Sequence, residues 1–298
     1  MKIIDDKFNE KKIEEKKDYE LVYDETLKYL RTIITDDKIW ADILKDSNNI
    51  IIQEANGEKY LIKTEKGDIL SLNFPSSAGA LTTSMNIELK NDGLEITPGV
   101  ALRKNFNKHQ LIHEFFHAIS TTQNNHFDKD GIVMVKIGTK VNYYDKDLNH
   151  STVDNTISSN GLNEGMTELL TSHFTNHYTG NYALFVVIAR ILSQGNQLLL
   201  KAYFSKDTEN LEKFYADVEE KQSLITRQDL CMLNPNAIDE ELIAKVIAGA
   251  LEYSKAYNVI IEKEEFDKMM DYLDDNYILD SETWSELVSS FQSSRSCD

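Results

Sequence analysis

Apolar residues recur at helical spacing in two parts of the chain. From 18 to 45, leucine and isoleucine fall three or four positions apart, which predicts one or two amphipathic helices. From 162 to the end the same spacing dominates, interrupted by glycine and proline, and it predicts a series of helices whose last member carries Trp284, Leu287 and Phe291. Residues 1–17 are dense in charges of both signs and predict an irregular start.

Between these helical parts the pattern changes to short apolar runs, which predict strands. Three runs occupy 50–54, 59–63 and 68–72. They are separated by Asn56-Gly57 and Lys66-Gly67. Because Asn-Gly between such runs favours a tight turn, we predict hairpins here.

A second hairpin is predicted from the runs at 85–89 and 94–97, which flank Asn91-Asp92-Gly93. An antiparallel sheet is the plain interpretation of the whole region. An extended peptide can add to a sheet edge as a further strand. The segment 94–97 is the one that we predict to form such an edge.

The longest helical signal near the middle of the chain begins at Asn107. Asn107 with Gln110 at the third helical position resembles a capping box, and the helix is predicted to run to about Thr121. The polar residues that follow predict loops and one hairpin, formed by 132–137 and 140–144.

Together these elements predict an α+β fold. Residues 1–121 are expected to form an N-terminal subdomain of helices, a twisted and mostly antiparallel sheet, and the helix that begins at Asn107. Residues 122–160 are expected to form a loop and hairpin over a cleft. Residues 161–298 are expected to form a mainly helical C-terminal subdomain.

The composition is that of an ordinary folded protein, but its net charge of −18 restricts the partners. Nucleic acids and anionic membranes require a basic surface, so the charge argues against both. It is compatible with a cationic peptide or protein substrate, although solubility alone explains such a charge equally well. The longest apolar run, 182–192, is shorter than the ~20 residues of a membrane span. The lack of a secretory signal and the presence of only two cysteines predict a cytoplasmic protein. Export by a non-classical route stays open, and nothing indicates the oligomeric state.

The most specific chemical signal is His113-Glu114-Phe115-Phe116-His117, an H-E-x-x-H pentapeptide inside the helix predicted from Asn107. Residues four apart share one helix face, so both imidazoles can bind one metal ion. Glu114 then lies beside that ion, where a carboxylate can deprotonate water. Phe115 and Phe116 are expected to fill the hydrophobic core.

A catalytic zinc ion has three protein ligands and one water, so a third ligand must follow. The metzincin pattern requires glycine and histidine three and six residues after His117, where this chain has Ser120 and Gln123, and that class is excluded. Glu164 and Glu168 lie four apart in a predicted helix. One of them can bind the ion while the other accepts a hydrogen bond from a ligand histidine.

These two segments resemble those of a known family. An HExxH helix followed by Asn163-Glu164-Gly165-Met166-Thr167-Glu168 is similar to the gluzincins, the thermolysin-like branch of the zinc metallopeptidases, and closest to bacterial proteins that carry an N-E-G-x-T-E helix. The resemblance covers about 85–205 and implies a zincin-like fold and one zinc ion. It implies that His113, His117 and Glu164 are the zinc ligands, Glu114 is the general base, and Glu168 is the hydrogen-bond partner of His113.

The sequence departs from this family in one important respect. No histidine follows His177, so the histidine that stabilises the transition state in the family has no counterpart. A hydrogen-bond donor must replace it, and the candidates are Tyr143, Tyr144, His150, Tyr178 and Tyr182. Tyr178 is the first choice for mutation, although a tyrosine here also suits the end of a core helix.

Three functions are compatible with these features. The first is a zinc metallopeptidase that cuts peptides generally. The second is an effector or regulatory protease that recognises one protein substrate. The third is a metal-binding interaction module whose peptidase residues are idle. Glu114 argues against the third, because a structural zinc site needs no general base and favours four protein ligands.

Overall fold

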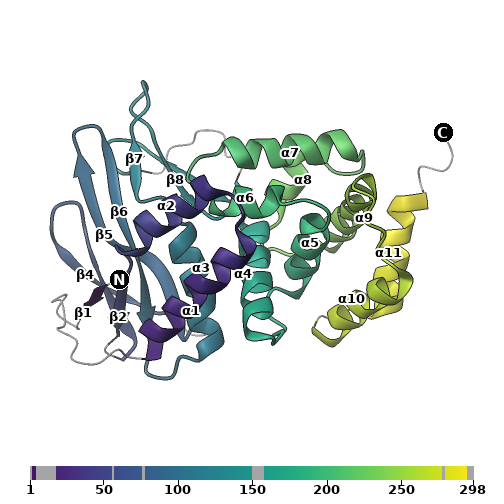
Figure 1. Cartoon of the computed structure of the whole chain (residues 1–298), viewed down its shortest axis with the longest axis horizontal. Coiled ribbons are helices and arrows are strands. Elements are labelled where there is room, and N and C mark those ends of the chain that lie inside the picture. Colours follow the sequence, from purple (N-terminus) through teal and green to yellow (C-terminus); the bar gives the residue numbers. More distant parts are fainter. Residues whose placement is uncertain are drawn as a thin grey trace. The chain divides into compact units, whose positions relative to one another are not determined.

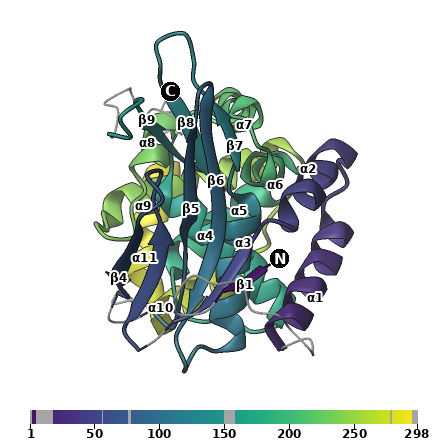
Figure 2. The same ribbon diagram turned by 90° about the vertical axis from the view of Figure 1, so that its left-hand side faces the viewer.

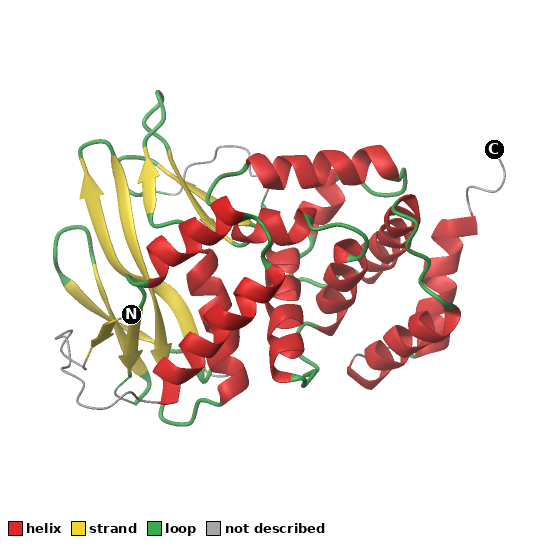
Figure 3. Cartoon of the chain, viewed as in Figure 1, coloured by secondary structure: helices red, strands yellow, loops and turns green. Residues whose placement is uncertain are grey.

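All described strands lie before residue 145, whereas helices occur from residue 18 to residue 293 (Figure 3). A computed structural model describes residues 2–4, 18–55, 57–75, 78–149, 158–276 and 279–293. The chain divides into two units. The first comprises 1–153 and 204–206, and the second comprises 154–203 and 207–298. All strands in the described part of the chain belong to the first unit. The expected α+β class with a helical C-terminal region is therefore confirmed.

The first unit contains three helices and nine strands among its described residues. The helices are α1 (Asp18–Ile33), α2 (Asp37–Ser47) and α3 (Lys108–Ser120). The strands are β1 (Lys2–Ile4), β2 (Ile51–Glu54), β3 (Lys59–Lys63), β4 (Ile69–Asn73), β5 (Ala80–Lys90), β6 (Gly93–Leu102), β7 (Asn124–His126), β8 (Val133–Ile137) and β9 (Lys140–Tyr144). The strand β1 lies where the sequence predicted an irregular start, and residues 5–17 lie outside the described residues.

The main sheet is mixed and has the order β1-β2-β6-β5-β3-β4, with β7 paired to β6. Three of its strand pairs are parallel, namely β1–β2, β2–β6 and β3–β5, and the other three are antiparallel. The expectation of a mostly antiparallel sheet is therefore too simple. The hairpin predicted at Asn56-Gly57 is also wrong, because β2 pairs with β1 and β6 rather than with β3. Ile51 and Ile52, side by side in β2, are both buried, which is typical of an interior parallel strand.

The other predicted hairpins are confirmed. Strands β3 and β4 pair around Lys66-Gly67, and β8 pairs with β9 as a separate two-stranded sheet. Strands β5 and β6 pair around Asn91-Asp92-Gly93 and continue well beyond the predicted runs, to Ala80 opposite Leu102. A register shift between Ser84 and Asn86 interrupts that pairing. Whether the β8–β9 hairpin covers a cleft stays a prediction.

The segment 94–97 is not a sheet edge, contrary to expectation. It lies within β6, whose residues pair with β5 on one side, while Leu94 and Glu95 pair with Asn125 and Asn124 of β7 on the other. Ile96 also donates its main-chain N–H to Gln123 at 2.7 Å. The hydrogen-bonding groups that an added peptide requires are therefore occupied here.

Helix α3 packs on β5 and β6, and α1 and α2 pack against α3 (Figure 1, Figure 2). Phe115 and Phe116 are fully buried in this layer. The ring of Phe115 meets Tyr23 edge-on at 4.9 Å, and that of Phe116 meets Tyr29 at 6.3 Å. The prediction that these phenylalanines serve the core is confirmed. Their burial fixes the rotation of α3 about its axis.

The second unit is helical in all of its described elements. They are α4 (Asn160–Thr175), α5 (Ala183–Ser193), α6 (Leu198–Phe204), α7 (Glu209–Lys221), α8 (Arg227–Met232), α9 (Glu240–Ala256), α10 (Lys263–Asn276) and α11 (Ser281–Ser293). The residue Phe204 already belongs to the first unit. Helix α5 is buried along nearly its whole length, in contact with α4, α9 and α10, and forms the centre of this unit's core.

No single helix among the described residues is long and apolar enough to cross a membrane. Helices α5 and α6 satisfy such a criterion only when taken together, and they are bent by 117° relative to each other.

Candidate metal centre

Helix α3 is fixed at its N-terminal end by the predicted capping box. The main-chain N–H of Gln110 donates to the Asn107 side chain at 2.8 Å, and the Gln110 side chain accepts from the N–H of Asn107 at 3.2 Å. Two of the unpaired N–H groups at the start of the helix are thereby satisfied. The capping-box prediction is confirmed.

The C-terminal end of α3 is held more extensively. Ser120 and Thr121 both donate their hydroxyl groups to the main-chain oxygen of His117, at 3.0 and 2.8 Å. The ammonium group of Lys206 donates to the main-chain oxygens of Ile119 and Thr121, at 2.9 and 3.0 Å. These bonds occupy main-chain oxygens that a helix end leaves unpaired, so the turn that carries His117 is firmly placed.

His113 and His117 face each other on the buried side of α3. The two residues are only 8% and 7% exposed. The two Nε2 atoms lie 3.2 Å apart. Two nitrogen ligands of a tetrahedral zinc ion, each about 2.05 Å from the metal, are about 3.3 Å apart. The two imidazoles are therefore already spaced as ligands of one small metal ion.

Glu114 is attached to the sheet by two hydrogen bonds from one residue of β5. Its carboxylate oxygen Oε2 accepts the main-chain N–H of Thr82 at 2.6 Å, and its main-chain oxygen accepts the Thr82 hydroxyl at 2.7 Å. A carboxylate that accepts a main-chain N–H is fixed in direction. Glu114 is half-buried, and its carboxylate is oriented by the Thr82 N–H.

The N-cap residue of helix α4 is Ser159. Its hydroxyl oxygen accepts the main-chain N–H of Leu162 at 3.3 Å, and its hydroxyl donates to the main-chain oxygen of Leu230 at 2.6 Å. The glycine of the N-E-G-x-T-E segment has a packing role. A Cβ at Gly165 would collide with the main-chain carbonyl of Phe185 in α5. Glycine therefore permits the close approach of α4 and α5 immediately beside Glu164.

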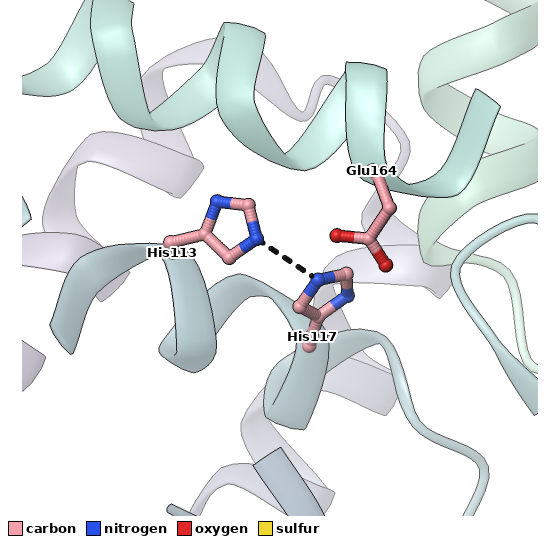
Figure 4. Close-up of side chains that lie close together, drawn as sticks. All are labelled: His113, His117 and Glu164. Carbon is pink, nitrogen blue, oxygen red and sulfur yellow. Dashed lines mark hydrogen bonds between the residues drawn. The ribbon is translucent and has the colours of Figure 1, made fainter. Parts of the chain in front are cut away.

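His113, His117 and Glu164 form a group that can hold a metal ion. Each offers one ligand atom, and these atoms all lie within 4.8 Å of one another. Figure 4 shows both imidazole rings and the Glu164 carboxylate turned toward one another. Within the described part of the chain this is the one group of three or more His, Cys, Asp or Glu residues with such geometry. Two neutral imidazoles and one carboxylate are an ordinary donor set for zinc, so the residues fit such an ion.

The described histidines His109, His173 and His177 are not part of this group. His109 is half-buried one turn before His113. His173 packs edge-on against Tyr178 at 6.0 Å, and burial together with the charge of Arg190 lowers its pKa. His177 is exposed. Of the histidines on α3 and α4, only His113 and His117 belong to the group that can hold a metal ion.

Glu168 is 1% exposed, and its Oε1 accepts the hydroxyl of Thr179 at 2.6 Å. This threonine lies in the loop between α4 and α5. The role of Glu168 as hydrogen-bond partner of His113 stays a prediction, as does the role of Glu114 as general base.

The candidate donors for the transition state lie in different elements. Tyr178 is 41% exposed in the loop after α4, and its ring meets both His173 and Tyr272 edge-on. Burial of part of its side chain raises its pKa. Tyr182 is the N-cap of α5, with left-handed backbone at φ 57°. Two further candidates lie in β9, and His150 lies outside the described residues.

Three residues that hold the side chains or the helix of the candidate site were not identified from the sequence. They are Thr82, Thr179 and Lys206. Each acts on a residue that is 11 to 87 positions away along the chain. Threonine and lysine at these positions belong to no local periodicity or motif, so only the folded chain reveals them.

Comparison with protein-family models, with curated proteins and with solved structures finds no match for this chain. The likeness to gluzincins therefore rests on the two sequence motifs and on the His-His-Glu group.

Proposed function

We propose that this protein is a zinc-dependent metallopeptidase. The observation that carries the proposal is the His113-His117-Glu164 group, with Glu114 adjacent to one of its histidines on α3. A site that binds zinc only for stability has no use for an oriented carboxylate beside a ligand histidine. A hydrolase requires one.

In the proposed reaction, His113, His117 and Glu164 hold the zinc ion. When bound, zinc supplies Lewis-acid polarisation of the substrate carbonyl and makes water easier to deprotonate. Glu114 takes the proton from the attacking water and later passes it to the leaving nitrogen. Because Oε2 is held by the Thr82 N–H at 2.6 Å, Oε1 is the oxygen that we assign to this transfer.

The proposed substrate is an extended peptide, and its proposed binding place is strand β5. The expected edge at 94–97 is already paired with β5 and β7. Residues Ala80–Ser84 of β5 pair with β6 on one side. On the other side of β5, the neighbouring strand β3 pairs only at Asn86. This stretch includes Thr82, the residue that holds Glu114. An extended peptide added along Ala80–Ser84 would therefore bring its main-chain carbonyl beside the general base.

The test compares the wild-type protein with Glu114→Gln on a peptide library derived from whole-proteome digests, after measurement of bound zinc. The glutamine amide oxygen can still accept the Thr82 N–H, so fold and zinc content should persist. Loss of a general base should lower the cleavage rate by about 10²- to 10⁴-fold. Glu241→Gln, an exposed glutamate at the start of α9, is the matched control and should cleave normally.

Equal cleavage by the wild-type and Glu114→Gln proteins would contradict the proposal. One equivalent of zinc without cleavage by either protein would favour a protease for a single protein substrate or a binding module. Glu164→Ala should abolish stoichiometric zinc binding, and its failure to do so would overturn the ligand assignment.

A further inference from the structure

The carboxylate of Glu168 is held by a residue outside its own helix. Glu168 lies one turn after Glu164 on α4 and is 1% exposed. The hydroxyl of Thr179 donates to its Oε1 at 2.6 Å. A hydroxyl-to-carboxylate bond of this length is charge-assisted and stronger than a bond between neutral groups. It restricts rotation of the carboxylate about its last torsion.

Thr179 is in turn held by helix α10. The hydroxyl of Tyr272 donates to the main-chain oxygen of Thr179 at 2.6 Å. Burial, with the nearby charges of Glu168 and Tyr178, raises the pKa of Tyr272 to about 12, so this hydroxyl keeps its proton at neutral pH.

A second contact fixes the same loop. A Cβ at Gly180 would collide with the side-chain oxygen of Asn276 at the end of α10. Glycine thus allows the loop to lie directly against that helix. The main-chain N–H of Asn181 donates to the Thr179 hydroxyl oxygen at 3.3 Å, which sets the direction of the hydroxyl.

We propose that Thr179 is a positioning residue of the metal centre, which orients the Glu168 carboxylate so that it accepts a hydrogen bond from a zinc-ligand histidine. This inference rests on the proposed function, because it requires the zinc site and the role assigned there to Glu168. Partners of ligand histidines fix ring orientation and raise ligand basicity, and their loss typically weakens metal binding 10- to 100-fold. Thr179 acts on that partner rather than on the ligand. Loss of the Thr179 hydroxyl should therefore weaken zinc binding about tenfold, the lower limit of that range.

The experiment measures zinc affinity by competition with a chromophoric chelator, together with the melting temperature of the zinc-free protein. Thr179→Val removes the hydroxyl and keeps the shape of the side chain, and should weaken zinc binding about tenfold. Thr179→Ser restores a hydroxyl and should recover most of the affinity. Tyr272→Phe loosens the loop without touching Glu168 and should weaken binding less, in the same direction.

Thr226→Val is the matched control. The Thr226 hydroxyl also donates to a carboxylate, that of Asp229 at 2.9 Å, and belongs to the same unit, in the capping box of α8. It should lower the melting temperature without changing zinc affinity. A purely structural role for Thr179 predicts the same behaviour for both valine variants.

The outcomes separate this inference from the proposed function. Unchanged zinc affinity in Thr179→Val, with normal binding by the wild-type protein, overturns the inference and leaves the proposed function standing. The same holds if Thr179→Ser binds zinc no better than Thr179→Val. A wild-type protein that binds no zinc overturns both. If Thr179→Val does not fold, the affinity of Tyr272→Phe decides, and a value equal to that of the wild-type protein overturns the inference.

Discussion

Replacement of Lys206 by methionine should destabilise the first unit strongly. The Lys206 ammonium group lies 3.3 Å from the Asp46 carboxylate and donates to two main-chain oxygens at the end of α3. The two side chains are only 18% and 11% exposed. Burial lowers the pKa of Lys206, while the charge of Asp46 opposes this change. Methionine fills a similar volume but leaves the carboxylate and both oxygens without this donor.

The magnitude follows from the burial of the pair. Breaking a buried ion pair from one side costs about 3–5 kcal/mol, because an uncompensated charge remains. Since part of the Lys206 side chain still contacts water, we expect about 3 kcal/mol, at the lower limit. For a folding unit of this size, that corresponds to a fall in melting temperature of roughly 6–12 °C.

The measurement is thermal and urea unfolding of Lys206→Met, Asp46→Ala and the double variant. Because the two residues interact, the double variant should be less destabilised than the two single effects added together, by at least about 1 kcal/mol. Lys45→Met changes an exposed lysine next to Asp46 on the same helix and should stay within about 0.5 kcal/mol of the wild-type protein. A loss below about 1 kcal/mol in Lys206→Met, or strict additivity in the cycle, would refute the reasoning.

Two further predictions concern the second unit. Gly165→Ala should destabilise it by about 2 kcal/mol or more, because the added methyl group meets the rigid main chain of Phe185; calorimetry should show a smaller loss for Gly249→Ala, where a Cβ meets the Ile225 side chain at 2.8 Å. Although burial raises the pKa of Asp229, its bonds to Lys245 and Thr226 lower that pKa on balance. The charged form therefore adds stability above the unfolded pKa of about 3.9 and loses it as the pH falls through the folded value. Asp229→Asn should thus be less stable than the wild-type protein by about 1 kcal/mol at pH 7, and urea unfolding should show this difference vanishing in acid.

The local elements were largely predictable from the sequence, and the sheet was only partly so. The capping box at Asn107 and the β5–β6 hairpin depend on residues within a few positions of one another, and both are confirmed. Strand β2 also lies where it was predicted. Its partners are β1 and β6 rather than β3. Local spacing does not record which distant strands supply the main-chain hydrogen bonds at its two edges.

The candidate metal group was also predictable where it depends on local spacing and unpredictable where it depends on distant residues. Residues four apart on a helix must share a face, so the pairing of His113 with His117 follows from the pentapeptide alone. Glu164 was inferred from a second motif, and the structure places its carboxylate with the two imidazoles. The motif could not indicate what orients these side chains.

The sequence by itself determined most of the helical and strand segments and the residue types that can bind a metal ion, since both depend on local spacing. Only the tertiary structure decided that β6 is interior and that Thr82 holds Glu114. It also decided that Thr179 holds Glu168. The physical reason is that such hydrogen bonds join groups from separate elements, and no local pattern records which elements meet when the apolar faces are buried.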